Sequence, residues 1–142
     1  MDTPFVELDF KVKTYDVDMA QIVHNAVYIR WLEDLRTALM DKYLPLQHWM
    51  ARDLMPVLLE TRIAYRRAVK LFEVVHGRLE MPRFAPVKWE MNVQFTVDGE
   101  LRADAHQTGC FIDMKTMRAT KIPDDYRSVF AGDPAIGNHS KP

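Results

Sequence analysis

The sequence predicts an α+β domain in which an antiparallel sheet packs against one long helix. Three observations predict this class: one long amphipathic helix pattern follows the first strand, further strand patterns come after it, and an Asp-Gly pair joins two of them. In such a layering the helix and the sheet each cover the other's apolar face. At 142 residues the chain is expected to form one domain over residues 1–130, with a flexible tail over residues 131–142.

The first strand is predicted by strict alternation. Apolar side chains stand at every second position from Val6 to Val12, and charged side chains fill the positions from Glu7 to Lys13. This period of two places one face of the strand in the core and the other in water. The following stretch, residues 14–24, loses the alternation and is expected to be a loop.

The long helix is expected over residues 26–42. Asn25 is a good N-cap residue, because its side-chain oxygen can accept hydrogen bonds from the free N–H groups of the first turn. A stripe of large apolar side chains then follows at helical spacing. Its members are Tyr28, Trp31, Leu32, Leu35 and Leu39. Pro45 ends this pattern, and residues 46–53 are expected to form a short second helix.

The remaining strands are expected to form a meander. They are predicted at residues 57–66, 71–80, 87–97 and 101–115, with a short strand at 117–121 and a short helix at 124–130. Pro82 and Pro86 are expected to break the pattern between strands. Asp98-Gly99 lies between two alternating runs and predicts a type I′ turn, in which both central residues have positive φ. Gly109 is expected to mark a β-bulge. The outer face of such a sheet still has to be covered, and oligomerisation is one way to cover it.

Composition excludes several classes of protein. Lys and Arg total 19 and Asp and Glu total 20, so a net charge of −1 argues against a protein held mainly by nucleic acid or an anionic membrane. The single cysteine, Cys110, cannot form an internal disulfide, and no Cys/His cluster has zinc spacing. The start has no signal-peptide pattern, and no run approaches the roughly 18 apolar residues of a membrane span. A cytoplasmic protein is therefore expected.

The segment before the long helix is where the sequence suggests chemistry. Asp16 and Asp18 lie in a loop a few residues ahead of the helix start. A helix N-terminus presents free N–H groups and a partial positive charge, which can polarise a carbonyl while a nearby carboxylate attacks it or activates water. The alternative is that both aspartates are simply turn residues.

This segment resembles the helix-start motif of hotdog-fold thioesterases of the 4-hydroxybenzoyl-CoA thioesterase-like superfamily. The matching residues are Asp18, Val23, Asn25, Tyr28, Arg30, Trp31, Leu32 and Glu33. The resemblance extends over residues 5–130 and implies a hotdog fold, in which an antiparallel sheet of five or six strands wraps around the long helix. It also implies a homodimer or a dimer of dimers, hence a homotetramer, with the site at a subunit interface.

The resemblance implies hydrolysis of an acyl-CoA thioester to a free carboxylic acid and CoA, without a metal or redox cofactor. Asp18 matches the catalytic carboxylate, which acts as nucleophile or as general base. Asn25 matches the first-turn position whose backbone N–H polarises the thioester carbonyl. His24 and Tyr28 are expected to contact the substrate.

A basic cluster follows one of the predicted strands. Arg62, Arg66, Arg67 and Lys70 are expected to hold the phosphates of coenzyme A, or else to be a solvated strand end.

Three positions depart from the family pattern. Gln21 stands where glycine is usual, and Ile22 and His24 also differ; Gln21 in particular suggests a rearranged loop. Glu33 on the helix is a second candidate acid, or else an ion-pair partner for a neighbouring arginine such as Arg36. Two alternative functions stay open: a thioesterase acting on acyl-carrier protein, and a non-catalytic protein that binds acyl ligands.

Overall fold

The computed structural model describes residues 3–131, so the predicted tail lies almost wholly outside the described residues. The elements follow the expected order. They are β1 (Phe5–Lys11), a single 3-10 turn η1 (Thr14–Asp16), α1 (Asn25–Tyr43), α2 (Leu46–Ala51), β2 (Leu54–Tyr65), β3 (Val74–Phe84), β4 (Lys88–Val97), β5 (Glu100–Asp113), β6 (Arg118–Ala119) and α3 (Asp124–Ala131).

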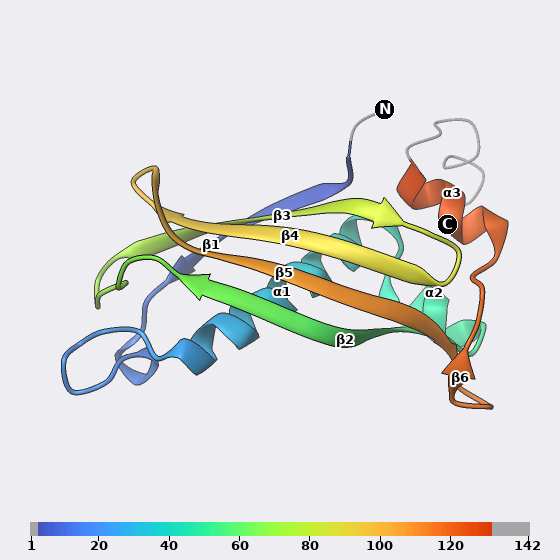
Figure 1. Cartoon of the computed structure of the whole chain (residues 1–142), viewed down its shortest axis with the longest axis horizontal. Coiled ribbons are helices and arrows are strands. Elements are labelled where there is room, and N and C mark those ends of the chain that lie inside the picture. Colours follow the sequence, from blue (N-terminus) through green and yellow to red (C-terminus); the bar gives the residue numbers. More distant parts are fainter. Residues whose placement is uncertain (1–2, 132–142) are drawn as a thin grey trace.

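The strands form one antiparallel sheet in the order β1-β3-β4-β5-β2, and the short β6 pairs with β5. Figure 1 shows this sheet curling over one side of α1, with the η1 loop at one end of the molecule and α2, β6 and α3 at the other. The predicted α+β class and the hotdog arrangement are confirmed. Since β2 is an edge strand, its outer edge is not paired within the described chain.

The predicted apolar stripe of α1 makes the core contacts. Leu32, Leu35 and Leu39 are fully buried. Trp31 stacks on Phe10 of β1 with ring centroids 5.2 Å apart. Each fully buried side chain of this size contributes about 1.5–3 kcal/mol of hydrophobic free energy, so the stripe is what fixes the helix to the sheet.

The start of α1 lies one residue earlier than predicted. His24, not Asn25, is the N-cap residue, and its side chain forms no capping hydrogen bond. The reason is local: the His24 N–H donates to the Asp16 carbonyl at 2.9 Å, which keeps His24 in the extended backbone of the loop. Asn25 is therefore the first helical residue and lies within the first turn.

The predicted turn between β4 and β5 is confirmed, whereas the predicted bulge is displaced. Asp98 and Gly99 have φ values of 50° and 79°, as a type I′ turn requires. The pairing of β2 with β5 shifts between Leu58 and Glu60, so the extra residue lies on β2. Gly109 faces this shift, but a Cβ there would lie 2.0 Å from the Trp89 ring, so glycine is required for the indole to pack.

Proline does not end β3 as predicted. The strand passes through Pro82 to Phe84, and its pairing with β4 shifts between Glu80 and Arg83. Such a shift accommodates an exposed proline because the ladder is already interrupted there. The strand also begins at Val74 rather than at residue 71, because residues 66–73 form a loop that packs against the η1 loop.

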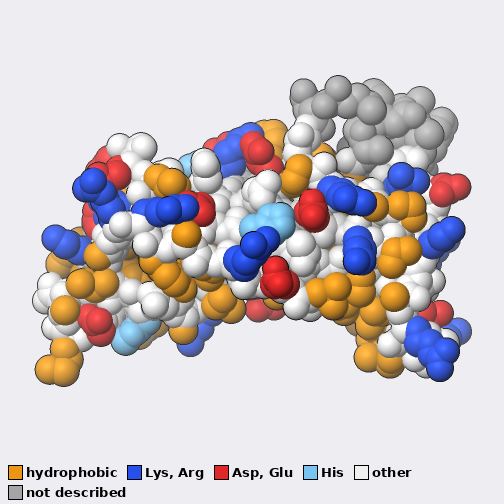
Figure 2. Space-filling view, in the orientation of Figure 1, with side chains coloured by type: hydrophobic (Ala, Val, Ile, Leu, Met, Phe, Trp, Pro, Cys, Tyr) orange, Lys and Arg blue, Asp and Glu red, His pale blue; other side chains and the backbone are white. Residues whose placement is uncertain are grey.

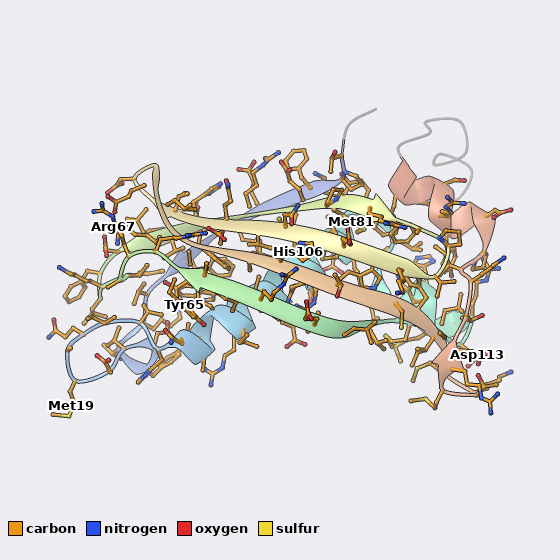
Figure 3. The ribbon with its side chains drawn as sticks, in the orientation of Figure 1. Met19, Tyr65, Arg67, Met81, His106 and Asp113 are labelled. Carbon is orange, nitrogen blue, oxygen red and sulfur yellow. The ribbon has the colours of Figure 1, made fainter. Side chains whose placement is uncertain are left out.

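The outer face of the sheet is polar. Figure 2 shows a histidine near the centre of this face among charged and neutral polar side chains, and Figure 3 labels His106 on it; the exposed Asn92 and Gln94 belong to the same face. Water can therefore cover this face, so it does not need the protein cover suggested by the sequence. The edge strand β2 carries three of the exposed apolar side chains of the described chain, Leu58, Leu59 and Tyr65. None of the described helices is long and apolar enough to cross a membrane.

Candidate active site

The loop that precedes α1 is a tight hairpin. Val17 and Val23 form an antiparallel bridge, and the Asp18 N–H donates to the Ile22 carbonyl at 3.0 Å. The hairpin is fixed to the β2–β3 loop, because the Val23 N–H donates to the Val69 carbonyl at 2.8 Å. Backbone hydrogen bonds therefore set the position of Asp18 relative to the helix.

One oxygen of the Asp18 carboxylate is fixed and the other is free. Asp18 Oδ1 accepts hydrogen bonds from the N–H groups of Ala20 at 2.8 Å and Ile22 at 3.2 Å. Oδ2 has no hydrogen-bond partner among the described residues, and the residue is exposed. A carboxylate oriented in this way can act as a base or a nucleophile through its free oxygen.

Asp16 differs from Asp18. Its side chain is 6% exposed, and Oδ2 accepts the Lys13 N–H at 2.9 Å. This contact closes the η1 turn. Asp16 is therefore a turn residue, which was the alternative that the sequence left open for both aspartates.

Gln21 occupies the backbone conformation that glycine favours. Its φ is 62°, in the left-handed region, which costs a non-glycine residue roughly 1–2 kcal/mol. The departure from the family pattern is thus accommodated by strain at Gln21 itself. The rearrangement that this residue suggested is not needed for the loop to close, since the Gln21 N–H still donates to the Asp18 carbonyl at 2.9 Å.

The N-terminus of α1 provides free donors beside this loop. The N–H groups of Asn25 and Ala26 have no acceptor within the described part of the chain. Together with the helix dipole they form a positive end that can hold a carbonyl oxygen. The Asn25 carbonyl accepts the Tyr65 hydroxyl at 3.3 Å, which ties the first turn of α1 to the end of β2.

A hollow of about 260 Å³, here called the N-terminal pocket, opens at this end of α1. Among the residues that line it are four that the sequence identified as site residues: Asn25, Tyr28, Arg66 and Arg67. Tyr65, which the sequence did not identify as a site residue, lines the pocket as well. Its position directly before Arg66 at the strand end could have indicated this role. Figure 3 shows Tyr65 and Arg67 at the same end of the molecule as Met19 in the hairpin.

The two tyrosines of this pocket are neutral. Their rings meet edge to face with centroids 5.3 Å apart. Burial, with a smaller effect of Tyr65, raises the pKa of Tyr28 to about 12, and burial also raises the pKa of Tyr65. Both phenols therefore keep their protons near neutral pH, and the proton of Tyr65 is the one donated to the Asn25 carbonyl.

The predicted basic cluster is divided by the fold. Arg62 lies on the outer face of the sheet and does not line the N-terminal pocket. Arg66 is paired with Asp104 at 2.8 Å, and Arg67 is paired with Glu100 at 3.4 Å. These exposed pairs are weak enough to exchange a carboxylate for a phosphate.

Asp18 and His24 also lie outside the lining of the N-terminal pocket. Asp18 is opposite Ile22 in the hairpin, and His24 is exposed at the N-cap. Within one described chain the carboxylate thus lies beside the pocket rather than in it.

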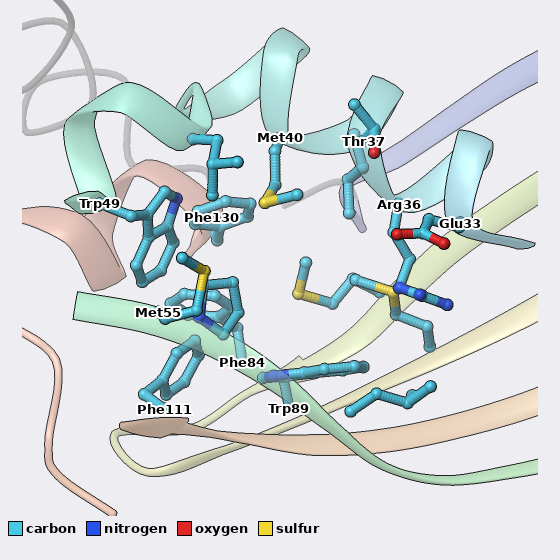
Figure 4. Close-up of a pocket in the computed structure, with 16 residues that line it drawn as sticks. Glu33, Arg36, Thr37, Met40, Trp49, Met55, Phe84, Trp89, Phe111 and Phe130 are labelled. Atoms are coloured by element: carbon cyan, nitrogen blue, oxygen red, sulfur yellow. The ribbon is translucent and has the colours of Figure 1, made fainter. Parts of the chain in front are cut away.

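A second cavity of about 240 Å³, here called the distal pocket, lies between α1, α2 and the sheet. The sequence did not predict its position or the residues that line it. Figure 4 shows aromatic and methionine side chains at one end and Glu33 and Arg36 at the other. Its main apolar lining residues are Met40, Trp49, Met55, Phe84, Trp89 and Phe111.

The predicted pairing of Glu33 is not formed, since no Arg or Lys nitrogen lies within 4.0 Å of its carboxylate among the described residues. No group of three or more His, Cys, Asp or Glu side chains in residues 3–131 is arranged to hold a metal ion.

This fold, with a carboxylate-bearing loop at the start of its long helix, defines a hotdog protein of the thioesterase type. A family model for the thioesterase-like superfamily matches residues 12–130, and the chain belongs to this family. The resemblance noted in the sequence is confirmed, and so is the expectation of a thioester hydrolase.

Individual relatives agree with this assignment. The long-chain acyl-CoA thioesterase FadM of Escherichia coli (strain K12) is 26% identical over 124 residues, which are 86% of this chain and 94% of that protein. The hypothetical protein SAV2348 of Staphylococcus aureus, solved in complex with CoA, has a TM-score of 0.82 at 17% identity and covers 100% of this chain and 89% of its own. The 1,4-dihydroxy-2-naphthoyl-CoA thioesterase Slr0204 of Synechocystis has a TM-score of 0.80 at 13% identity, covering 91% and 97%.

Proposed function

We propose that the protein is an acyl-CoA thioesterase, in which Asp18 and the N-terminus of α1 act together on the thioester carbonyl. The observation that carries this proposal is the orientation of Asp18. Two backbone amides hold one carboxylate oxygen and leave the other free, on a hairpin that leads directly into the free N–H groups of α1. The similarity to FadM and to a fold solved with CoA supports the substrate class.

In this mechanism the thioester oxygen accepts a hydrogen bond from the Asn25 N–H, which stabilises the negative charge that develops on it. Asp18 then acts in one of two ways. As a general base it takes a proton from a water molecule, which attacks the carbonyl carbon and expels the CoA thiolate. As a nucleophile its free oxygen attacks the carbon itself, the C–S bond breaks with release of the CoA thiolate, and water hydrolyses the resulting mixed anhydride in a second step.

The N-terminal pocket is proposed to receive the CoA end of the substrate. The neutral hydroxyls of Tyr28 and Tyr65 can hydrogen-bond to it, and Arg66 and Arg67 can exchange their carboxylate partners for phosphate oxygens. His24 is proposed to contact the substrate from the N-cap. Arg62 lies on the outer face of the sheet, away from the N-terminal pocket, so no contact with CoA bound in this pocket is proposed for it.

We propose further that the functional unit is a homo-oligomer, up to a homotetramer, in the cytoplasm. Leu58, Leu59 and Tyr65 expose apolar surface along the unpaired edge of β2, which a second copy can cover. A partner placed there would also enclose the seam between α1 and β2, on which both pockets open.

The test is a panel of thioesters assayed by thiol release with the wild type, Asp18→Asn and the matched control Asp34→Asn. Asp34 is an exposed aspartate on α1 outside both pockets on the α1–β2 seam. We expect Asp18→Asn to lower kcat by at least about 100-fold, the usual contribution of a positioned acid or base, with little change in KM. Asp34→Asn should remain within about twofold of the wild type.

Each other outcome identifies what has failed. A wild type that cleaves acyl-carrier-protein thioesters but not acyl-CoA would change the substrate class. A wild type that cleaves neither would leave a non-catalytic acyl-binding protein. If Asp18→Asn keeps the full rate, the role of Asp18 is wrong, and Glu33 becomes the carboxylate to test. A single turnover in water enriched in oxygen-18 tests the nucleophilic route. Attack of water on the Asp18 carbonyl of the anhydride places the label in the Asp18 carboxylate, whereas a general base leaves this carboxylate unlabelled.

A further inference from the structure

The distal pocket contains a polar group that the proposed hydrolysis does not use. Arg36 Nη1 donates to Gln107 Oε1 at 2.9 Å, and Gln107 Nε2 donates to Thr61 Oγ1 at 2.9 Å. Gln107 is 1% exposed, and it is one of two buried polar residues in the described chain. A buried amide that satisfies both of its neighbours fixes the orientation of the half-buried guanidinium.

Arg36 still has donors to offer. A guanidinium carries five N–H groups, and the only acceptor that they contact among the described residues is Gln107. No carboxylate oxygen lies within 4.0 Å of it in the described chain. Desolvation lowers the pKa of Arg36, which nevertheless stays charged near neutral pH.

Glu33 balances the charge at this end of the pocket. It lies one helical turn before Arg36, lines the same cavity and is exposed at its mouth. Together the two side chains present one donor and one acceptor with no net charge. A ligand carboxylate would be attracted by Arg36 and repelled by Glu33. A neutral hydroxyl or carbonyl oxygen can accept a hydrogen bond from Arg36 and is not repelled by the charge of Glu33.

The rest of the cavity is apolar and large enough for part of a ligand. Its volume of about 240 Å³ exceeds the roughly 150 Å³ of an apolar cavity that takes up benzene. Trp49 and Trp89 contribute flat walls, and Met40 and Met55 contribute side chains that adapt to the shape of a guest.

The two pockets lie along one seam between α1 and β2. Tyr28 and Tyr65 line the N-terminal pocket, whereas Arg36 and Leu58 line the distal one. The eight residues from Tyr28 to Arg36 correspond to about 12 Å of helix. An acyl group whose thioester lies at the helix N-terminus would therefore direct its far carbons toward Arg36.

We propose that the distal pocket selects acyl groups that carry a hydroxyl or oxo oxygen far from the thioester, with Arg36 donating a hydrogen bond to that oxygen. A hydroxyl can in addition donate to Glu33. This inference rests on the proposed thioesterase function for its substrate, but the recognition by Arg36 can be measured without any turnover.

The kinetic test compares matched acyl-CoA pairs from hexanoyl to dodecanoyl. Each pair consists of the plain chain and the same chain with a terminal hydroxyl. The same chain with a terminal carboxylate is tested as a third substrate. We expect the wild type to favour a hydroxyacyl substrate by about tenfold in kcat/KM, because a hydrogen bond to a charged donor contributes about 1.5 kcal/mol or more. Arg36→Met should lose this preference, so that its kcat/KM values for the hydroxyacyl and the plain chain differ by less than about threefold.

Two further variants separate recognition from folding. Arg36→Lys keeps a charged donor for Gln107 and should retain part of the preference, so it replaces Arg36→Met if the latter does not fold. Arg30→Met removes an exposed arginine of the same helix outside the distal pocket and should change nothing. A wild type without preference, or an equal preference in Arg36→Met, overturns the inference. So does a preference for the carboxylated chain, because it would mean that Glu33 does not oppose an anion.

The binding test uses cyclohexanol and its near-isostere methylcyclohexane, with the fluorescence of Trp49 and Trp89 as the signal. We expect the ratio of their dissociation constants to shift by at least about fivefold toward methylcyclohexane in Arg36→Met. If this shift occurs and no thioester is cleaved, the proposed function fails while the recognition stands. If thioesters are cleaved and the ratio is unchanged, the recognition fails alone.

Discussion

The two ends of α1 are built in different ways. At its N-terminus, a short hairpin with exposed polar side chains is held by backbone hydrogen bonds to the β2–β3 loop. Farther along the helix, the distal pocket is enclosed by side chains from four strands and three helices, which are distant in the sequence. Trp49 and Phe111 stack there with ring centroids 5.5 Å apart.

The two ends therefore have different roles. The hairpin end has unpaired N–H donors and one free carboxylate oxygen, which can polarise and attack a carbonyl. The aromatic end, which is the distal pocket, has an apolar cavity and the half-buried Arg36, which can discriminate among substrates. Changes at the aromatic end should therefore reduce stability first, and changes at the hairpin end should alter local order and rate.

The largest expected effect is at the aromatic end. Gly109→Ala places a Cβ 2.0 Å from the Trp89 ring and 2.2 Å from the Val57 carbonyl oxygen, and the backbone oxygen cannot move away cheaply. We expect the free energy of unfolding to fall by about 3 kcal/mol, as for severe overpacking. Urea unfolding measures it.

Gly99→Ala is the matched control for this substitution. Gly99 has positive φ but nothing within 4 Å of a new Cβ, so only conformational strain of about 1 kcal/mol is expected. An equal loss in both variants would show that the contact with Trp89 is not what requires Gly109.

The sequence predicted the hairpin end better than the aromatic end. Asp18, the start of α1 and the Asp98-Gly99 turn depend on neighbours within a few residues, so a local pattern can indicate them. Arg36 and Gln107 are 71 positions apart, and only the register of β5 and the rotation of α1 bring them together. The same holds for Gly109, whose requirement arises from the Trp89 ring on the neighbouring strand rather than from its own strand.

A second effect tests the attachment of the hairpin. Arg102 donates to both carboxylate oxygens of Glu73 at 3.0 Å and to the Ala68 carbonyl at 2.8 Å, and so it fixes the loop on which the hairpin rests. The pair is partly buried, with side chains 14% and 25% exposed. We expect Glu73→Gln to lower the free energy of unfolding by about 2 kcal/mol, less than for a fully buried pair. Glu60→Gln, which breaks an exposed pair with Arg62, should cost under about 0.5 kcal/mol.

The same pair gives a dependence on pH. The hydrogen bond from Arg102 lowers the pKa of Glu73 below its unfolded value. Its contribution to stability is therefore present above the unfolded pKa and is lost as pH falls through the folded pKa. Glu73→Gln should flatten the acid side of the stability curve below about pH 5. An unchanged acid limb would contradict this assignment.

A smaller effect tests the strain in the hairpin. Gln21→Gly removes the cost of positive φ and adds unfolded-state entropy, so we expect a net stabilisation of about 0.5 kcal/mol. Met19→Gly, two residues away and fully exposed without positive φ, should instead destabilise the protein by a similar amount. Thermal unfolding of both variants measures the difference, and a loss of stability in both would mean that the Gln21 backbone is not strained.

The smallest effect lies on the outer face, across the sheet from α1. The imidazole of His76 on β3 contacts Asp9 and Glu7 of β1, each at 2.8 Å, and the hydrogen bond to Asp9 is the main cause of its raised pKa. Because the folded pKa is above the unfolded value, the added stability is complete below the unfolded pKa of about 6.5 and is lost as pH rises through the folded pKa. These side chains are well exposed, so the change should be under about 0.5 kcal/mol.

His76→Gln should remove this slope from the unfolding free energy above about pH 6, whereas His106→Gln should keep it, since His106 contacts the neutral amide of Asn92. The outer face takes no part in either pocket on the α1–β2 seam, so the pH dependence of thioester hydrolysis should be the same in His76→Gln and in the wild type. A pH profile of kcat/KM that moves with His76 would mean that the two faces of the sheet are coupled, and the division of tasks between the ends of α1 would then have to include the outer face.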